Sequence, residues 1–133
     1  MNIGDAAKAS GVSAKMIRHY EAIQLIGNSL RTESGYRTYG EKEIHVLRFI
    51  KSARSMGFSL EQIRLLLSLW QDRTRASADV KALATAHVNE LNAKINELTA
   101  MRNLLQSLTI SCPGDERTDC PILVGIAAEI AND

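Results

Sequence analysis

The stretch from Ser77 to about Leu108 constrains the fold more than any other part of this 133-residue chain. Its apolar residues recur at the spacing of one helix face, and Ser77 is placed to cap its start. A helix of this length measures roughly 45 Å. The few residues that follow cannot cover so long a stripe, so we expect it to pair with a second copy in a coiled coil, or alternatively to fold back on its own N-terminal part. The stripe consists of Val88, Leu91, Ile95 and Leu98, continued after a slip by Met101, Leu105 and Leu108.

The composition and the ends of the chain exclude several classes of protein. Apolar residues make up 45% and charged residues 23%, which is typical of a soluble globular protein and not of a disordered one. The start has no secretory signal, and the apolar stretch 122–128 is too short to span a bilayer. We therefore expect a cytoplasmic protein without a membrane partner, in which Cys112 and Cys120 are thiols and not a structural disulfide.

The beginning of the chain predicts two short helices joined by a tight turn. The first covers 3–9 and stops at Gly11; the second begins after Ser13, a good N-cap, with a hydrophobic staple between Val12 and Ile17. Such a pair, with a basic outer face on its second helix, is typical of a helix-turn-helix. That outer face carries Lys15, Arg18 and His19, whereas Met16, Ile17 and Tyr20 form the inner side.

The rest of the chain is predicted to be mainly α-helical, with one small hairpin. Residues 27–39 break the helical period and combine turn signals with strand formers, which predicts a two-stranded wing. Helices are expected from about Glu41 to Met56 and, after a Ser59/Gln62 capping box, to about Trp70. The expected division is a winged helix-turn-helix domain over 1–70, a linker over 71–76, a dimerisation helix over 77–109, and a loop with a short C-terminal helix over 110–133.

The charge is divided unevenly along the chain. Residues 1–70 hold ten Lys and Arg against six Asp and Glu, and residues 71–133 hold six against nine. A basic front half of net +4 before a rear half of net −3 indicates an anion-binding module, for which double-stranded DNA is the expected partner. A solvated basic face is the alternative. The predicted DNA-binding set is Ser13, Lys15, Arg18, His19 and Tyr20 on the second helix, Arg31, Tyr36 and Arg37 on the wing, and Arg54 at a later helix end.

The two cysteines enclose a loop of seven residues that directly follows the long helix. Pro121 suits the first position of a new helix, which puts Cys120 at the N-cap, where the helix dipole stabilises a thiolate. Two thiolates cannot fill a tetrahedral zinc site, but they suit a soft ion that accepts two donors, such as Cu(I). A disulfide, a redox thiol pair or two idle cysteines remain as alternatives. Enzyme signatures such as a phosphate loop or a serine elbow are missing, so no catalysis is expected.

Taken together, these residues resemble the MerR family of transcription regulators, and within it the copper- and gold-responsive, CueR-like branch. The resemblance covers nearly the whole chain in the right order. The matching stretches are Met1-Asn-Ile-Gly, Ile17-Arg-His-Tyr-Glu21, Arg31 with Ser34-Gly-Tyr-Arg-Thr-Tyr39, Arg54 with Met56-Gly-Phe-Ser-Leu60, Ser77-Ala-Asp-Val-Lys81, Cys112-Pro-Gly-Asp and Asp119-Cys-Pro-Ile122.

The resemblance implies an antiparallel coiled-coil homodimer that sits on a promoter whose spacer is too long for RNA polymerase. Metal binding then distorts the DNA and realigns the promoter elements, which activates metal-efflux and resistance genes. It also implies that Cys112 and Cys120 bind the ion. Divalent-ion members carry a cysteine where this chain has Ser77, so a monovalent soft ion, Cu(I), Ag(I) or Au(I), is expected. A thiol redox-responsive DNA-binding regulator is the alternative function.

Overall fold

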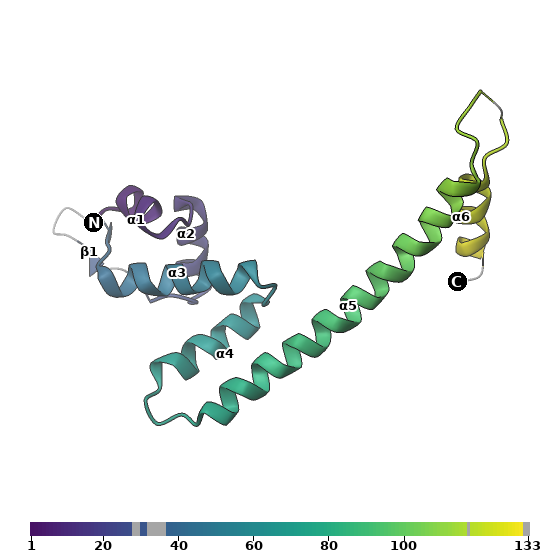
Figure 1. Ribbon diagram of the computed structural model, residues 1–133. Helices are drawn as coiled ribbons and strands as arrows, with labels where there is room; N and C mark the ends of the chain where they lie inside the picture. The colour runs from purple at the N-terminus through teal and green to yellow at the C-terminus, as the bar shows by residue number, and fades with distance from the viewer. Residues whose placement is uncertain (28–29, 32–36, 117, 132–133) are drawn as a thin grey trace. The chain divides into compact units, whose positions relative to one another are not determined.

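The computed structural model describes residues 1–27, 30–31, 37–116 and 118–131. The chain divides into two compact units, Met1–Lys81 and Ala82–Asp133. The described residues are mainly helical, as predicted, and none of their helices has the length and apolar character needed to cross a bilayer. The elements, labelled in Figure 1, are α1 (Ile3–Ser10), α2 (Ala14–Ala22), β1 (Leu30–Arg31), β2 (Arg37–Thr38), α3 (Glu41–Ser55), α4 (Leu60–Gln71), α5 (Ser77–Ser111) and α6 (Pro121–Ala131).

The turn between α1 and α2 has the capping predicted for it. The Asn2 side chain accepts a hydrogen bond from the Asp5 backbone N–H at the start of α1 (2.8 Å). Gly11 ends that helix at φ 77°, in the left-handed region where glycine is favoured. The Ser13 hydroxyl then accepts from the Met16 N–H (3.2 Å) and caps α2. Local sequence signals therefore set both ends of α1 and the start of α2.

The capping box predicted at the start of α4 is confirmed. The Ser59 hydroxyl accepts from the Gln62 backbone N–H (3.1 Å), and the Gln62 side-chain oxygen accepts from the Ser59 N–H (2.7 Å). Helix α3 has a related start, in which the Glu43 carboxylate accepts from the backbone N–H of Gly40 (2.9 Å). These contacts satisfy backbone donors that a helix leaves without partners in its first turn.

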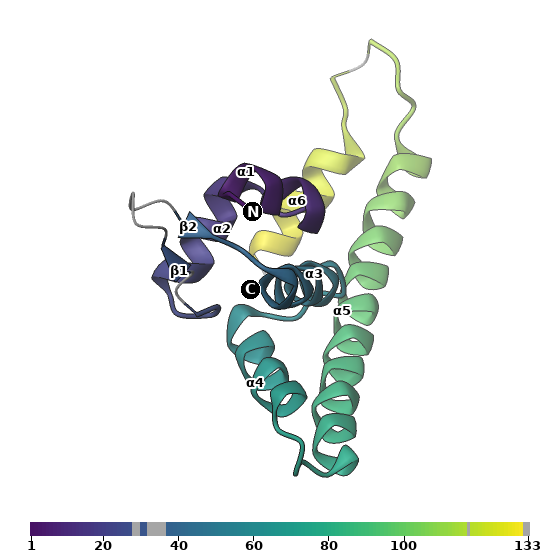
Figure 2. The same cartoon turned by 90° about the vertical axis from the view of Figure 1, so that its left-hand side faces the viewer.

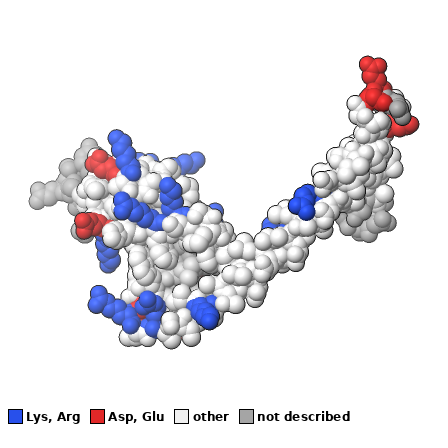
Figure 3. All heavy atoms as spheres, in the orientation of Figure 1, with Lys and Arg blue, Asp and Glu red and all other residues white. Residues whose placement is uncertain are grey.

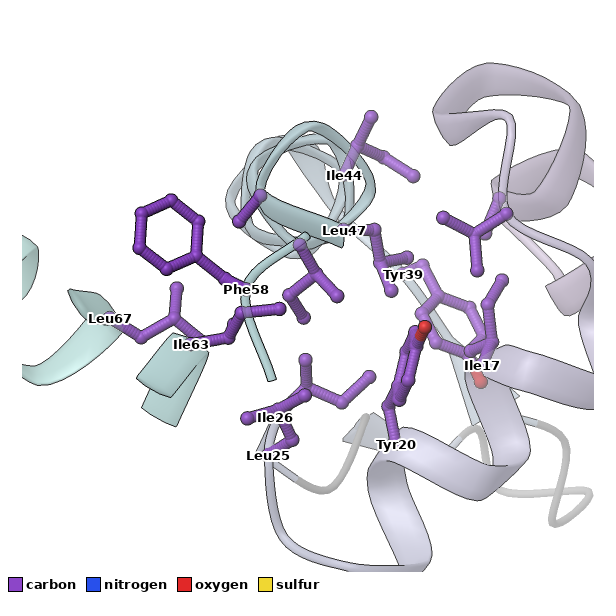
Figure 4. Packing of buried hydrophobic residues seen from close by; sticks show 14 residues of the cluster. Ile17, Tyr20, Leu25, Ile26, Tyr39, Ile44, Leu47, Phe58, Ile63 and Leu67 are labelled. Atoms are coloured by element: carbon purple, nitrogen blue, oxygen red, sulfur yellow. The ribbon is translucent and has the colours of Figure 1, made fainter. Parts of the chain in front are cut away.

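The core of the first unit lies where α1, α2, α3 and α4 meet. Its most deeply buried large side chains are Ile17, Leu47, Ile50 and Ile63. The aliphatic side chains in Figure 4 point from α2, α3 and α4 toward one another. The two predicted staples belong to this cluster, since Val12 and Ile17, and likewise Phe58 and Ile63, are all buried. Aliphatic packing thus holds the short helices together, as the low aromatic content of 5% requires.

Arg64 on α4 reaches across the unit to the end of α2. Its guanidinium donates to the carbonyl oxygens of Ile23 (2.8 Å) and Gln24 (2.9 Å). Ile23 is the C-cap of α2, and Gln24 is the one described non-glycine residue with a positive φ, 58°. Left-handed backbone is unfavourable for glutamine. The arginine therefore stabilises a strained turn and satisfies carbonyls that the helix end leaves open.

The second unit contains most of α5 and all of α6 (Figure 2). The predicted apolar stripe is exposed in the single chain: Val88, Leu91, Ile95 and Leu98 are 51%, 41%, 58% and 55% exposed. Leu108, at the end of the stripe, is more buried than these residues because α6 packs against it.

Replacing Arg64 with methionine should lower the free energy of unfolding of the first unit by about 1–2 kcal/mol. The substitution removes two charge-assisted hydrogen bonds and keeps a side chain of similar length. Thermal and urea unfolding followed by circular dichroism measure the loss. Arg73→Met is the matched control, since within the described residues Arg73 donates no hydrogen bond. Equal stability of the two variants would contradict the role given to Arg64.

Candidate nucleic-acid interface and metal-binding loop

Helix α2 has one buried and one basic exposed side. Ile17 is fully buried, whereas Lys15, Arg18 and His19 are all exposed. Arg18 and His19 lie three and four positions after Lys15, and the three residues therefore share the outer face of the helix. Figure 3 shows other Lys and Arg side chains spread over the same unit. The buried face of α2 packs on the core, and its exposed face carries basic side chains. This arrangement suits a helix that enters a DNA groove.

Two members of the set predicted for α2 have other roles in the structure. Tyr20 is 5% exposed and belongs to the core cluster, so its side chain packs on the inner face of the helix and does not form part of the outer face. The reason is helical geometry, because Tyr20 lies three residues after the buried Ile17. Ser13 is exposed but its hydroxyl caps the helix. Met16, expected on the inner side, is 37% exposed.

The wing is a short antiparallel ladder between β1 and β2. Its register pairs Leu30 with Thr38 and Arg31 with Arg37, so the two predicted arginines occupy directly opposite positions. Tyr36, the third residue predicted on the wing, lies outside the described residues. The backbone therefore brings two of the three predicted wing residues together.

Arg54, predicted at a helix end, lies in the last turn of α3 and is exposed. One of its guanidinium nitrogens donates to the Phe58 carbonyl oxygen (3.2 Å). This contact spans the turn between α3 and α4 and orients the side chain at the surface. A guanidinium has five N–H donors, so this bond leaves the group with the capacity to bind a phosphate as well.

The two cysteines lie at the facing ends of the two helices in the second unit. Cys112 directly follows α5, and its N–H donates to the Thr109 carbonyl oxygen (3.3 Å). The Cys120 carbonyl oxygen accepts from the Val124 N–H (3.1 Å), and α6 begins at Pro121. The predicted Pro121 position and the N-cap place of Cys120 are thus both confirmed. Both thiols are free and half-buried.

The loop between the cysteines is acidic and contains one left-handed turn. Gly114 has φ 66°, a conformation that favours glycine. Figure 3 shows acidic side chains gathered at the loop, which carries Asp115, Glu116 and Asp119. In the described part of the chain, no three His, Cys, Asp or Glu side chains lie together as a candidate metal site.

Gly125 allows α6 to pack closely on the end of α5. A Cβ atom at this position would lie 2.7 Å from Cδ1 and 3.1 Å from Cγ of Leu108, so the leucine side chain would have to move. The contact holds α6, which begins directly after Cys120, against α5, which ends directly before Cys112. Sequence reasoning did not single out this glycine, although a glycine inside an apolar helical run is a sign of close packing.

Ser77 differs slightly from its prediction as an N-cap. Helix α5 includes Ser77 as its first residue, and the Ala76 carbonyl oxygen accepts from the Asp79 N–H (3.1 Å). The serine is exposed at the start of the helix. Ala76 has no side-chain acceptor, so the helix begins without the cap that the sequence suggested.

Glu21 is a second residue that sequence reasoning missed. It lies on α2, is only 6% exposed, and accepts a 2.5 Å hydrogen bond from the hydroxyl of Tyr39, which is 3% exposed. Its position four residues after the buried Ile17 was a signal, because that spacing puts both on the inner face. A buried acid needs a specific partner, and Tyr39 supplies one.

Two family models match the chain. The model described as MerR HTH family regulatory protein matches residues 1–70, and the model described as MerR, DNA binding matches residues 44–108. The first match covers the whole helix-turn-helix and wing, and the second covers α4 and most of α3 and α5.

Relatives and solved structures agree with these models. The chain is 58% identical to heavy metal-dependent transcription regulator 2 of Rhizobium meliloti, over 96% of this chain and 86% of that protein. It is 45% identical to the transcriptional regulator CueR of Yersinia pestis, over 96% and 91%. Its fold is similar to the crystal structure of the regulator PbrR691 of Ralstonia metallidurans in complex with lead(II), with a TM-score of 0.81, 31% identity, and coverage of 95% and 98%.

Gly125→Ala should loosen the packing of α6 on α5. The added methyl group meets Leu108, and overpacking of this kind costs about 1–3 kcal/mol. Amide hydrogen exchange in α6 should become faster by roughly 5- to 100-fold, as measured by mass spectrometry. Val124→Ile adds one carbon to a side chain that is 69% exposed and serves as the control. Exchange at the wild-type rate in the alanine variant would contradict the close contact.

Proposed function

Because the chain belongs to the MerR family of helix-turn-helix regulators, we propose that it is a homodimeric, metal-responsive activator of metal-efflux and resistance genes. It responds to a monovalent soft ion, Cu(I), Ag(I) or Au(I), bound by Cys112 and Cys120. The observation that carries the proposal is the pair of free thiols at the facing ends of α5 and α6, in a chain whose first unit has a basic recognition helix. Names of relatives with heavy-metal and CueR-type functions support it.

The DNA contacts are assigned to the first unit, over residues 1–70. Lys15, Arg18 and His19 enter the major groove, because they form the exposed face of α2. Arg31, Tyr36 and Arg37 on the wing and Arg54 at the end of α3 bind phosphates. Ser13 contributes the N-terminal end of the recognition helix. Phosphate contacts give affinity and register, while the residues in the groove supply sequence preference.

The thiol pair fits an ion that accepts two soft donors. Thiolates are the ligands that monovalent copper and its heavier relatives prefer, and each cysteine belongs to the end of a helix whose backbone is hydrogen-bonded. Holding one ion with both thiols would tie the end of α5 to the start of α6. A monovalent ion leaves this complex with one negative charge, which the N-terminus of α6 offsets.

Activation is assigned to a change in the dimer that distorts the bound promoter. The dimerisation helix of residues 77–109, joined to the DNA-binding domain by the linker 71–76, pairs with a second copy through its exposed stripe. That stripe is apolar and exposed in the single chain, and a coiled-coil partner would bury it. Distortion of the DNA by the dimer then gives RNA polymerase access to realigned promoter elements. The loop and short helix of 110–133 sense the ion.

Cys112→Ser and Cys120→Ser should each abolish metal-induced transcription while leaving DNA binding intact. Serine keeps the size of the side chain but removes the soft donor. A reporter titrated with Cu(I), Ag(I), Au(I) and Zn(II) should show induction falling to the uninduced level in both variants. Electrophoretic mobility shifts check DNA binding. A variant that still responds to a monovalent ion would exclude the two-thiolate site.

The alternative, a thiol redox switch, predicts different chemistry at the same cysteines. Mass spectrometry of the protein after oxidant and after metal, without reductant, distinguishes the two. A disulfide that forms reversibly in step with transcription would favour the redox function. A mass increase of one bound ion with both thiols intact would favour metal sensing.

Ser77→Cys should broaden the response to divalent ions. In an antiparallel dimer, a third thiolate supplied by the start of α5 of the partner subunit adds the charge and the donor that Zn(II) or Hg(II) requires. Zn(II) or Hg(II) should then induce the same reporter, whereas neither ion should induce it with the wild-type protein. Ser77→Ala is the control, as it removes the hydroxyl without adding a donor. No gain of divalent response would refute the selectivity role of this position.

A further inference from the structure

We propose that Glu21 and Tyr39 form a strut that positions the wing relative to the recognition helix. The inference rests on the proposed function, since it concerns how phosphate contacts of the wing are set. Glu21 lies in the last turn of α2, and Tyr39 directly follows β2. The two residues are 18 positions apart in the chain, and a 2.5 Å hydrogen bond between their buried side chains joins the two DNA-facing elements.

Tyr39 is fixed by its backbone as well as by its hydroxyl. Its N–H donates to the Met1 carbonyl oxygen (2.8 Å), and its carbonyl oxygen accepts from the Met1 amino group (3.0 Å). Its ring is 3% exposed and packs in the core cluster. The backbone hydrogen bonds, the buried ring and the hydroxyl together determine where the chain leaves the wing.

The anchor lies close enough to the wing to control it. Arg37 is two residues before Tyr39, so their Cα atoms are at most about 7.6 Å apart. The register pairs Arg37 with Arg31, so the position of β2 also determines that of β1. On its other side the wing follows Leu25 and Ile26, both buried. A shift in the position of Tyr39 would therefore move both strands.

The chemistry of the pair favours a positioning role. A carboxyl group that is only 6% exposed loses its hydration, and the Tyr39 hydroxyl donates one hydrogen bond to it at a fixed direction and distance. A leucine and a phenylalanine could fill the same space but would not define the angle between two elements. Glu21 and Arg18 belong to the same helix, α2. The strut therefore fixes the position of the wing relative to the helix that enters the groove.

The test compares the salt dependence of DNA binding in Tyr39→Phe and wild type. The probe is a duplex that the wild-type protein selects from a random-sequence pool. Tyr39→Phe removes only the hydroxyl, and we expect affinity to fall by about tenfold at fixed salt. The slope of log affinity against log salt should become shallower by about one for each phosphate that the wing no longer binds.

Two further variants separate positioning from stability. Ile63→Val removes a carbon from the core on α4, away from the wing, and should lower the melting temperature without changing the salt slope. Glu21→Leu should make the slope as shallow as Tyr39→Phe does, and the double variant Glu21→Leu/Tyr39→Phe should bind little more weakly than either single variant. Independent, additive effects on affinity would overturn the strut.

An unchanged slope in Tyr39→Phe, with the wild type binding its selected duplex, would overturn this inference and leave the proposed DNA-binding function standing. Failure of the wild type itself to select any duplex would remove the proposed function, and this inference with it. A shallower slope in Tyr39→Phe, together with an unchanged slope in Ile63→Val, supports the strut.

Discussion

The first unit depends on satisfying the backbone groups at the ends of short helices. An α-helix leaves four carbonyl groups without intrahelical partners at its C-terminus, and α1 and α2 have only eight and nine residues. Arginine side chains from other elements bind carbonyl groups at the ends of both helices. Arg48 donates two hydrogen bonds to the Ala9 carbonyl oxygen (3.1 and 2.9 Å), and Arg64 binds the two carbonyls after α2. The helix-turn-helix is therefore held together by polar contacts at its corners as well as by its aliphatic core.

This use of arginine changes the meaning of the basic charge. Arg48 and Arg64 donate two hydrogen bonds each to backbone carbonyls of the unit, so part of the net +4 of residues 1–70 stabilises the fold. The cations of α2 differ, because Lys15 and Arg18 lie exposed on its outer face. The net charge of a segment thus predicts the sign of its partner, while the contacts of each residue decide which cations are available to that partner.

Local signals were sufficient to predict some parts of the structure and insufficient for others. The caps at Ser13 and Ser59 and the helix start at Pro121 were predictable, because each depends on residues within one turn of the chain. The contacts of Arg64 and of Glu21 join residues 40 and 18 positions apart, and only the packing of the helices brings these together. Tyr20 was predicted both on the inner side of its helix and in the DNA-binding set, and its burial agrees with the inner side that its spacing from Ile17 indicates. The thiols follow from the sequence, but their support by the packing of α6 on α5 does not.

Helix α6 contacts α5 at Gly125, near its middle, so a tilt of α6 would take place about this point. Gly125 is five residues after Cys120 and six before Ala131, which corresponds to arms of about 7.5 Å and 9 Å. A small tilt that moves the cysteine end in one direction therefore carries the far end of α6 by a similar amount in the opposite direction. The apolar side chains of Leu123 and Ile126 lie on either side of this pivot and are 68% and 43% exposed. Any tilt of α6 about this contact would therefore move these two apolar side chains in opposite directions.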